Sequence, residues 1–288
     1  METEITVVMS VHNVEKHIRA SIQSLLARES SDLQLLIVED PPFDSTREIL
    51  NTFRDPRIRY VRNQAHLGLS ASRNISVKLA SGRYIFFTDA DCIASPTWVE
   101  QGLDSLADPL CAAVEGRTYY VSETYESTYS DDVIENHKGG DFMTCNMVYK
   151  RAAILEAGGF DERYTRMEDR DLALRVTKLG KIDFNPDMIV YHQKRAMKPG
   201  DFVRRGRHIR NRVLLYKKFR ERDSMLWRIV FPVNLLSIMV PPLILRSLLR
   251  NRFETKDDFL LLPFIYAKMV YERLCLWQMS AKERTFLI

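Results

Sequence analysis

Short apolar runs alternate with amphipathic segments through the first part of the chain. A continuous run of this kind is typical of a strand buried on both faces. Between the runs, apolar residues recur at the spacing of a helix, as at Ile18, Ile22 and Leu25. Strands that alternate with helices predict βαβ units, so we expect an α/β fold with a mostly parallel sheet flanked by helices. The predicted strands are residues 5–10, 33–38, 58–61 and 84–87.

The fourth apolar run leads into a pair of carboxylates. Residues 84–92 read Tyr-Ile-Phe-Phe-Thr-Asp-Ala-Asp-Cys, so Asp89 and Asp91 follow the strand closely. Because unpaired charges are costly inside a covered sheet, we expect both at its carboxyl edge, where open α/β sheets bind ligands. Two hard oxygen donors there suit Mg²⁺ or Mn²⁺ shared with substrate phosphates. A strand followed by an Asp-rich turn without function fits this stretch equally well.

A second set of elements follows Pro96. The clearest is an amphipathic helix over residues 168–179, with Leu172, Val176 and Leu179 on one face. The segment 119–141 is polar, acidic and rich in tyrosine, and its pattern predicts no structure. The other predicted elements are a helix to Leu106, a strand near 111–115, a strand over 143–149, a helix over 151–157 and extended chain over 182–191.

Composition predicts a folded chain with reduced thiols. Of the 288 residues, 45% are hydrophobic and 28% are charged, which is typical of a domain with a core rather than of a disordered chain. The four cysteines lie far apart and form no Cys-x-x-Cys pair, so we expect buried thiols rather than disulfides or a zinc site. The first residues lack the pattern of a secretory signal, and we expect the catalytic part in the cytoplasm.

Positive charge is concentrated in one segment. Residues 194–222 hold twelve Lys or Arg and two acidic residues, whereas the whole chain has a net charge of +4. Such a segment predicts an anionic partner: a membrane surface, a phosphorylated acceptor or nucleic acid. Its flanks are long apolar runs rather than interleaved stacking aromatics, so nucleic acid is not the expected partner.

Two apolar stretches follow the basic segment. Residues 229–245 carry no charge and would form a helix of about 25 Å, short for a hydrocarbon core and interrupted by prolines. Residues 259–267 are shorter still. We expect interfacial or re-entrant helices, with Trp227 and Trp277 among the headgroups; the alternative is a helical subdomain packed on the catalytic domain or on a partner chain. The predicted domains are residues 1–192, catalytic, and 193–288, basic and apolar.

Several motifs, taken in order, resemble a known family. Val-Val-Met-Ser-Val-His-Asn at 7–13, Ile-Val-Glu-Asp at 37–40, Gly-Leu-Ser-Ala-Ser-Arg-Asn at 68–74 and Asp-Ala-Asp at 89–91 form the first set. Gly-Gly-Phe-Asp-Glu at 158–162 and Glu-Asp-x-Asp at 168–171 follow. Over roughly residues 4–192 this order resembles a family 2 glycosyltransferase of the GT-A fold. The resemblance implies transfer of a sugar from a nucleotide-diphosphate donor, with inversion, to a hydroxyl of a glycan or lipid-linked acceptor.

The resemblance also assigns residues to the donor nucleotide. His12 matches a position where an aromatic ring packs on the base, and Asp40, beside Glu39, matches a carboxylate that pairs with the base. Arg73 matches a basic residue of the same pocket. Where the family usually reads Asp-Asp-Gly-Ser, this chain reads Glu-Asp-Pro-Pro at 39–42, so the identity of the nucleotide is not predicted.

A divalent cation, Mn²⁺ or Mg²⁺, is implied as well, because the diphosphate gains negative charge as it leaves. Asp91 matches the metal ligand, and Asp89 would face the ribose or water on the metal. His192 follows an apolar strand and resembles an extra ligand or phosphate contact. A surface histidine at the head of the basic segment is the equal alternative.

An inverting transfer needs one carboxylate to take the proton of the acceptor hydroxyl. The resemblance gives this role to Asp169, and Glu168 is expected beside the acceptor. Asp169 lies three residues before Leu172 and should share its inward face, whereas Asp171 points elsewhere and can pair with Arg175. Without the resemblance, complementation of the helix dipole would explain these acids.

Three functions compete. The first is a glycosyltransferase that works on a lipid-linked acceptor at the cytoplasmic face of a membrane. The second is a nucleotidyltransferase on a related sheet, which the motifs at 158–162 and 168–171 disfavour. The third is a non-catalytic scaffold docked to a membrane. Intact carboxylates at 89, 91 and 169 disfavour it, because acids that are costly to bury tend to be lost when they have no use.

Overall fold

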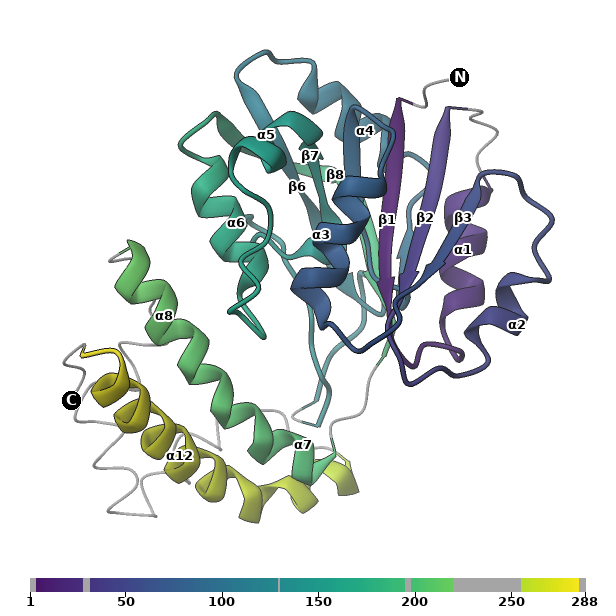
Figure 1. The fold of residues 1–288 in the computed structure, drawn as a ribbon. Coiled ribbons are helices and arrows are strands. Elements are labelled where there is room, and N and C mark those ends of the chain that lie inside the picture. The colour runs from purple at the N-terminus through teal and green to yellow at the C-terminus, as the bar shows by residue number, and fades with distance from the viewer. Residues whose placement is uncertain (1–3, 28–31, 129, 195–197, 220–254, 285–288) are drawn as a thin grey trace. The chain divides into compact units, whose positions relative to one another are not determined.

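The chain forms two compact units. One comprises residues 1–125 and 134–193, and the other residues 126–133 and 194–288. The computed structural model describes residues 4–27, 32–128, 130–194, 198–219 and 255–284 (Figure 1). The second unit therefore takes a short segment from the middle of the chain as well as its C-terminal part.

The first unit is built on one eight-stranded sheet. Its strand order is β3-β2-β1-β4-β7-β6-β8-β5. The strands β1 to β4 run parallel, whereas β7 is antiparallel to β4 and β6, and β5 is antiparallel to β8. The bounds are β1 Ile5–Val11, β2 Leu33–Glu39, β3 Ile58–Arg62, β4 Tyr84–Phe87, β5 Cys92–Ala94, β6 Cys111–Tyr120, β7 Met147–Lys150 and β8 Lys181–His192.

Helices cover both faces of this sheet, which confirms the predicted α/β fold. Helices α1 and α4 contribute to the core on one face, and α3, α5 and α6 to the core on the other. The three apolar runs of β1, β2 and β4 are buried because each strand is covered on both sides. The helices are α1 Ile18–Leu26, α2 Thr46–Leu50, α3 Leu69–Leu79, α4 Trp98–Leu106, α5 Arg151–Glu156 and α6 Glu168–Val176.

The direction of the second-half strands was not visible in the sequence. Apolar runs report burial but not direction, so the sheet is mixed where a mostly parallel one was expected. The segment 119–141, which had no prediction, begins as the end of β6 and continues as a loop over the buried Glu115. That carboxylate accepts hydrogen bonds from Asn136 Nδ2 and from the Gly140 and Phe142 N–H groups, which fixes the loop.

The C-terminal part of the second unit is helical over its described residues. Helices α7 (Pro199–Arg204) and α8 (Ile209–Phe219), joined by the 3-10 turn η2 (Arg205–His208), pack against the long α12 (Lys256–Lys282). Their core holds Ile209, Val213, Cys275, Leu276 and Met279. Asp132 binds Arg205 through two hydrogen bonds, and Asp258 accepts one from the Ser130 N–H group. The segment 126–133 is thereby held within this unit.

Of the two predicted apolar stretches, the structure describes only the second. Residues 229–245 and Trp227 lie outside the described residues. Residues 259–267 belong to α12, which continues through Pro263 as one helix of 27 residues. Within the described ranges, no helix has the length and hydropathy needed to cross a membrane.

Candidate active site

Four predicted site residues follow the carboxyl ends of parallel strands. His12 follows β1, and Asp89 lies just beyond β4. Glu39 is the last residue of β2, and Asp40 comes directly after it. Because β1, β2 and β4 are adjacent and parallel, these residues share one edge of the sheet. The topology therefore brings these residues to one edge of the sheet, as expected, and binding of the donor at this edge stays a prediction.

The Asp40 carboxylate closes the loop that leads into α3. One oxygen accepts from Asn63 Nδ2 at 2.5 Å and from Ser72 Oγ at 2.8 Å. The other accepts from the N–H groups of Leu67 and Gly68 at 3.1 and 2.8 Å. Burial acts to raise the pKa of Asp40, but these hydrogen bonds outweigh it and hold the pKa below its usual range. In this structure the carboxylate positions the loop, and any contact with a base would add to four existing bonds.

Glu39 faces β3 rather than the edge. Its Oε2 accepts hydrogen bonds from the Tyr60 hydroxyl and from Arg62 Nε, the latter at 2.8 Å. Burial and the neighbouring carboxylate raise the pKa of Tyr60 to about 12. The Arg62 guanidinium also lies 4.1 Å from the centre of the Phe43 ring. Glu39 thus fixes the strand end, and its predicted part in substrate binding stays a prediction.

His12 has an aromatic neighbour that the sequence did not indicate. Its Nδ1 donates to the Asp40 carbonyl at 3.3 Å, and its ring centre lies 5.2 Å from that of His66. His66 donates from Nδ1 to the Pro41 carbonyl at 3.1 Å. Both imidazoles are exposed, so two rings rather than one are presented beside Asp40.

Arg73 connects the donor edge to helix α6. Its Nη1 donates to Glu168 Oε1 at 2.6 Å, and its Nη2 lies 3.7 Å from Asp89 Oδ1. Arg73 and Glu168 are buried, and the guanidinium lies 5.6 Å from the centre of the Phe160 ring. Glu168 Oε2 is buried without a hydrogen bond in the described part of the chain. Three predicted site residues from distant parts of the sequence therefore form one ionic cluster.

Asp169 occupies the first turn of α6, beside this cluster. Burial, followed by the negative charge of Glu168, raises the pKa of Asp169 to about 7. The positive charge of Arg73 and backbone hydrogen bonds from Arg170 and Thr144 oppose the rise, and the Arg170 N–H group donates to Asp169 Oδ1 at 2.8 Å. A carboxylate with this pKa can take or give a proton near neutral pH.

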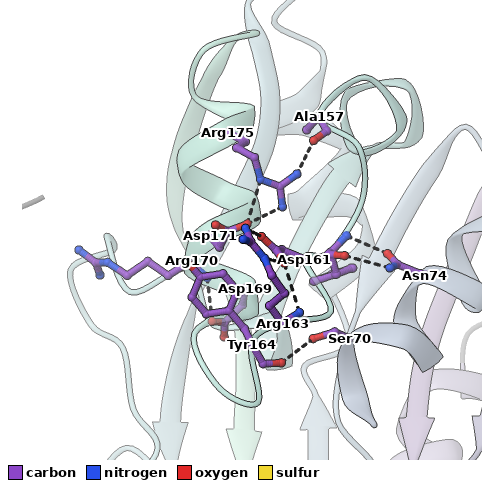
Figure 2. A network of polar contacts seen from close by, with 11 residues as sticks. Ser70, Asn74, Ala157, Asp161, Arg163, Tyr164, Asp169, Arg170, Asp171 and Arg175 are labelled. Carbon is purple, nitrogen blue, oxygen red and sulfur yellow. Dashed lines mark hydrogen bonds and ion pairs between the residues drawn. The ribbon is translucent and has the colours of Figure 1, made fainter. Parts of the chain in front are cut away.

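The loop before α6 is fixed by glycines and by Asn74 of α3 (Figure 2). Asn74 donates to the Phe160 carbonyl at 2.9 Å and accepts from the Phe160 N–H group at 2.7 Å. Gly158 and Gly159 have positive φ values of 84° and 73°, and a Cβ on Gly159 would lie 2.7 Å from Asn74 Oδ1. Met167 also has a positive φ, 70°, and directly precedes α6. The Gly-Gly-Phe-Asp-Glu motif thus sets the entry of the chain into α6.

The predicted pairing of Asp171 with Arg175 is confirmed. Arg175 donates from Nε to Asp171 Oδ2 at 2.9 Å, and it also donates to the Ala157 carbonyl (Figure 2). Asp171 is fully buried, so this carboxylate serves the packing of α6. The two acids of one turn therefore have separate roles: Asp171 binds the scaffold, and Asp169 lies with the ionic cluster.

Asp91 and His192 lie together, although 100 residues separate them in the sequence. Asp91 Oδ1 and His192 Nε2 are 3.6 Å apart, and both side chains are buried. His192 Nδ1 donates to the Gln193 carbonyl at 3.0 Å, because a carbonyl oxygen only accepts. Nε2 makes no hydrogen bond within the described residues. The histidine is therefore not on the surface, which was the alternative.

This pair fits a divalent cation. A neutral imidazole with its hydrogen on Nδ1 directs the Nε2 lone pair toward the carboxylate, which is repulsive unless a proton or a cation lies between them. One carboxylate oxygen and one imidazole nitrogen suit Mn²⁺, whereas Mg²⁺ prefers oxygen donors alone. Asp89, two residues before Asp91, has a half-buried side chain near Arg73. It reaches the same turn, since its carbonyl accepts from the Cys92 N–H group at 3.1 Å.

Comparison with known proteins decides the family. The family model described as Glycosyl transferase family 2 matches residues 6–160, more than half of the chain. The chain belongs to this family. The matched residues include both carboxylates of the Asp-Ala-Asp motif and the Gly-Gly-Phe motif at 158–160. As a glycosyltransferase it is an enzyme, and the nucleotidyltransferase and scaffold alternatives are set aside.

Individual relatives of the chain are glycosyltransferases as well. The glucosyltransferase WfgD of Escherichia coli, which acts on GlcNAc-diphosphoundecaprenol, is 27% identical over 150 residues, or 52% of this chain and 56% of that protein. An uncharacterized glycosyltransferase of Haemophilus influenzae is 23% identical over 66% of this chain and 65% of its own length. This chain therefore spans about half to two thirds of the length of these two relatives.

The fold is that of solved glycosyltransferases. The mannosyltransferase PcManGT from Pyrobaculum calidifontis, in complex with GDP-Man and Mn²⁺, superposes with a TM-score of 0.62 at 14% identity, covering 98% of this chain and 87% of that one. This confirms the predicted GT-A fold of the glycosyltransferase. The identity is too low to transfer a donor or a residue role.

Proposed function

We propose that this glycosyltransferase is an inverting, metal-dependent enzyme that moves a sugar from a nucleotide-diphosphate donor to a hydroxyl of a lipid-linked glycan. The observation that carries the proposal is the cluster around Arg73. Arg73 contacts both Asp89 at the donor edge and Glu168 at the start of α6, and Asp169 lies next to Glu168 in the sequence. A donor-binding edge and a carboxylate with a pKa of about 7 are thereby held in one rigid arrangement.

On the donor side, this chain offers carboxylates and rings around a diphosphate. His12 and His66 present two imidazole faces to a base, and Asp89 is placed for the ribose. Asp91 and His192 would hold a divalent cation, which when bound stabilises the charge of the departing diphosphate. That PcManGT was solved with Mn²⁺ supports this ion, as do the oxygen and nitrogen donors present here.

On the acceptor side, Asp169 is the base that takes the proton of the attacking hydroxyl. Its raised pKa makes it a stronger base than an ordinary aspartate while it remains largely ionised slightly above neutral pH. Glu168 Oε2, buried and without a hydrogen bond among the described residues, can accept a hydrogen bond from an acceptor hydroxyl. The ion pair with Arg73 holds Glu168 in place.

The stereochemistry of the product tests the mechanism. The purified protein is incubated with UDP-, GDP- and TDP-sugars of α configuration, Mn²⁺ and a short polyprenyl-diphosphate-linked sugar acceptor. We expect transfer from one nucleotide class and a β linkage in the product, because Asp169 activates the acceptor for direct displacement. NMR spectroscopy of the anomeric proton gives the configuration. An α product would contradict the role of Asp169 as the base.

The second unit supports attachment to a membrane surface. Exposed apolar side chains of α12 include Phe259, Leu260, Leu274 and Trp277, which are 57, 60, 54 and 47% exposed. Exposed cations on and before α8 are Arg204, Arg207, Lys217 and Lys218. Apolar side chains together with cations are the features of peripheral binding to anionic lipid. A lipid-linked acceptor, as in the name of WfgD, would meet the enzyme there, and we place it peripherally at the cytoplasmic face.

Vesicle flotation measures this attachment. We expect the full chain to float with vesicles that contain anionic phospholipid, and less with neutral vesicles or at high salt. The double variant Leu274→Glu/Trp277→Glu should lose about tenfold or more in apparent affinity, because two apolar side chains no longer enter the interface.

Leu110→Glu is the matched control for this experiment. Leu110 belongs to the first unit and is 73% exposed, so it undergoes the same chemical change at an exposed position outside α12. Its variant should float as the unmodified protein does. Equal flotation of the α12 variant, or no flotation of the unmodified chain, would exclude α12 as a membrane contact.

A further inference from the structure

The cation site contains a sulfur atom, and the proposed function does not use this atom. One ligand atom each from Asp91, Cys92 and His192 lie within 4.8 Å of one another, and all three side chains are buried. The mechanism above needs only the carboxylate and the imidazole. Cys92 is a free thiol, as are Cys111, Cys145 and Cys275.

The sheet holds these donors in place before any ion arrives. Cys92 begins β5 and pairs directly with His192 of β8 in an antiparallel ladder, so the two side chains lie on the same face. The Gln193 N–H group donates to the Asp91 carbonyl at 2.7 Å, which extends the ladder past the strand ends. Both the imidazole and the thiol are thereby fixed by backbone pairing rather than by mobile loops.

Nitrogen, oxygen and sulfur donors together select different ions from oxygen donors alone. Thiolate and imidazole suit Zn²⁺, Co²⁺ and Cd²⁺, whereas a site for Mg²⁺ gains nothing from sulfur. Among the described residues, this is the only group of three such side chains close enough to share one ion. Cys145 neighbours Cys92 but does not belong to the group.

We propose that Cys92 is a third protein donor of the cation site, which therefore binds a thiophilic divalent cation through Asp91, His192 and the Cys92 sulfur, in competition with Mn²⁺. On binding, a metal–sulfur bond forms and the thiol proton passes to the buffer. The proposal rests on the proposed function, because it takes the Asp91–His192 pair as the cation site.

Cobalt spectroscopy tests the sulfur directly. The full chain, reduced and freed of metal, is titrated with Co²⁺ alone while the thiolate-to-metal charge-transfer band in the near ultraviolet is followed. We expect a band that saturates at one equivalent and is displaced by Cd²⁺. Cys92→Ser should lose the band. Its affinity for Cd²⁺ relative to Mn²⁺, measured by calorimetry, should fall by about 10–100-fold or more.

Cys145→Ser is the matched control, since it removes the neighbouring buried thiol and should keep the band. Thermal unfolding checks that each variant is folded, and Cys92→Ala replaces Cys92→Ser if the hydroxyl is not tolerated. Absence of the band in the unmodified protein, or its survival in the Cys92 variants, would overturn the proposal.

The two proposals can fail separately. Nucleotide binding that depends on Mn²⁺ without a Co²⁺ band would retain the donor site and reject Cys92 as a ligand. A Co²⁺ band lost in Cys92→Ser, in a protein whose nucleotide binding ignores Mn²⁺, would retain Cys92 as a ligand. That second outcome would reject the cation's part in binding the donor.

Discussion

Replacing Asp169 with asparagine is expected to lower kcat by about 10²–10⁴-fold while nucleotide binding is retained. The amide keeps the shape of the side chain but cannot take the proton of the acceptor hydroxyl, and general-base catalysis contributes a factor of this size. Steady-state kinetics of the variant, with calorimetry of the nucleoside diphosphate, separates the two effects. Equal kcat values in variant and parent would exclude Asp169 as the base.

The raised pKa of Asp169 predicts the direction in which catalysis and stability change with pH. Asp169 must be ionised to act as a base, so kcat/KM of the parent should fall as the pH falls through about 7. The pKa is raised above 3.8, the usual value of an aspartate, so the folded protein binds the proton more tightly than the unfolded chain. Stability therefore decreases as the pH rises from about 4 to about 7. Asp169→Asn removes this cost and should raise Tm above pH 7.

Asp171 provides the matched control, because it is an aspartate in the same turn of α6. It is fully buried and bound to Arg175, so Asp171→Asn should lower the free energy of unfolding by about 1.5–3 kcal/mol. One variant should thus lose catalysis and gain stability, and the other should lose stability. Loss of stability in both would indicate that Asp169 is structural as well.

Replacing Asp91 with asparagine should abolish the effect of Mn²⁺ on nucleotide binding. Removal of even an outer partner of a metal ligand weakens metal binding by about 10–100-fold, and loss of a carboxylate ligand should cost at least as much. Calorimetry with UDP, GDP and TDP, each with and without Mn²⁺, measures the effect and identifies the nucleotide that the Glu-Asp-Pro-Pro turn leaves undetermined.

Two further variants test whether the effect of Mn²⁺ depends on the proposed cation site. His192→Gln should weaken the Mn²⁺ effect, because it removes the imidazole nitrogen that faces Asp91. Asp187→Asn, at an exposed position of β8, should leave it unchanged. A folded protein that binds none of the three diphosphates would refute the donor site as a whole.

The sequence predicted the layers of the fold better than the direction of its strands. Apolar runs and helical spacing reflect burial, and burial is what β1, β2, β4 and α6 display. Direction depends on which strands pair, and pairs such as β6 with β8 join segments distant in the chain. The division predicted between residues 192 and 193 stays a proposal.

Residues of the candidate site could be predicted where they belong to a sequence motif. Contacts between residues from distant parts of the chain could be predicted less well. The Arg73–Glu168 pair and the meeting of Asp91 with His192 require the tertiary fold, although each residue had been named. His66 was missed because it lies in a loop without a pattern. Cys92 was interpreted only as a buried thiol, since its pairing with His192 depends on the β5–β8 ladder.

The segment 126–133 affects how the catalytic unit can be separated from the rest of the protein. The chain passes between the two units three times, after residues 125, 133 and 193. A shortened protein that ends at residue 193 would keep Ser130 and Asp132 but remove Asp258 and Arg205, to which they bind. A catalytic fragment therefore requires two deletions, of residues 126–133 and of residues 194–288, and a new join between residues 125 and 134. Cutting once would leave an acidic loop whose counter-charges had been removed.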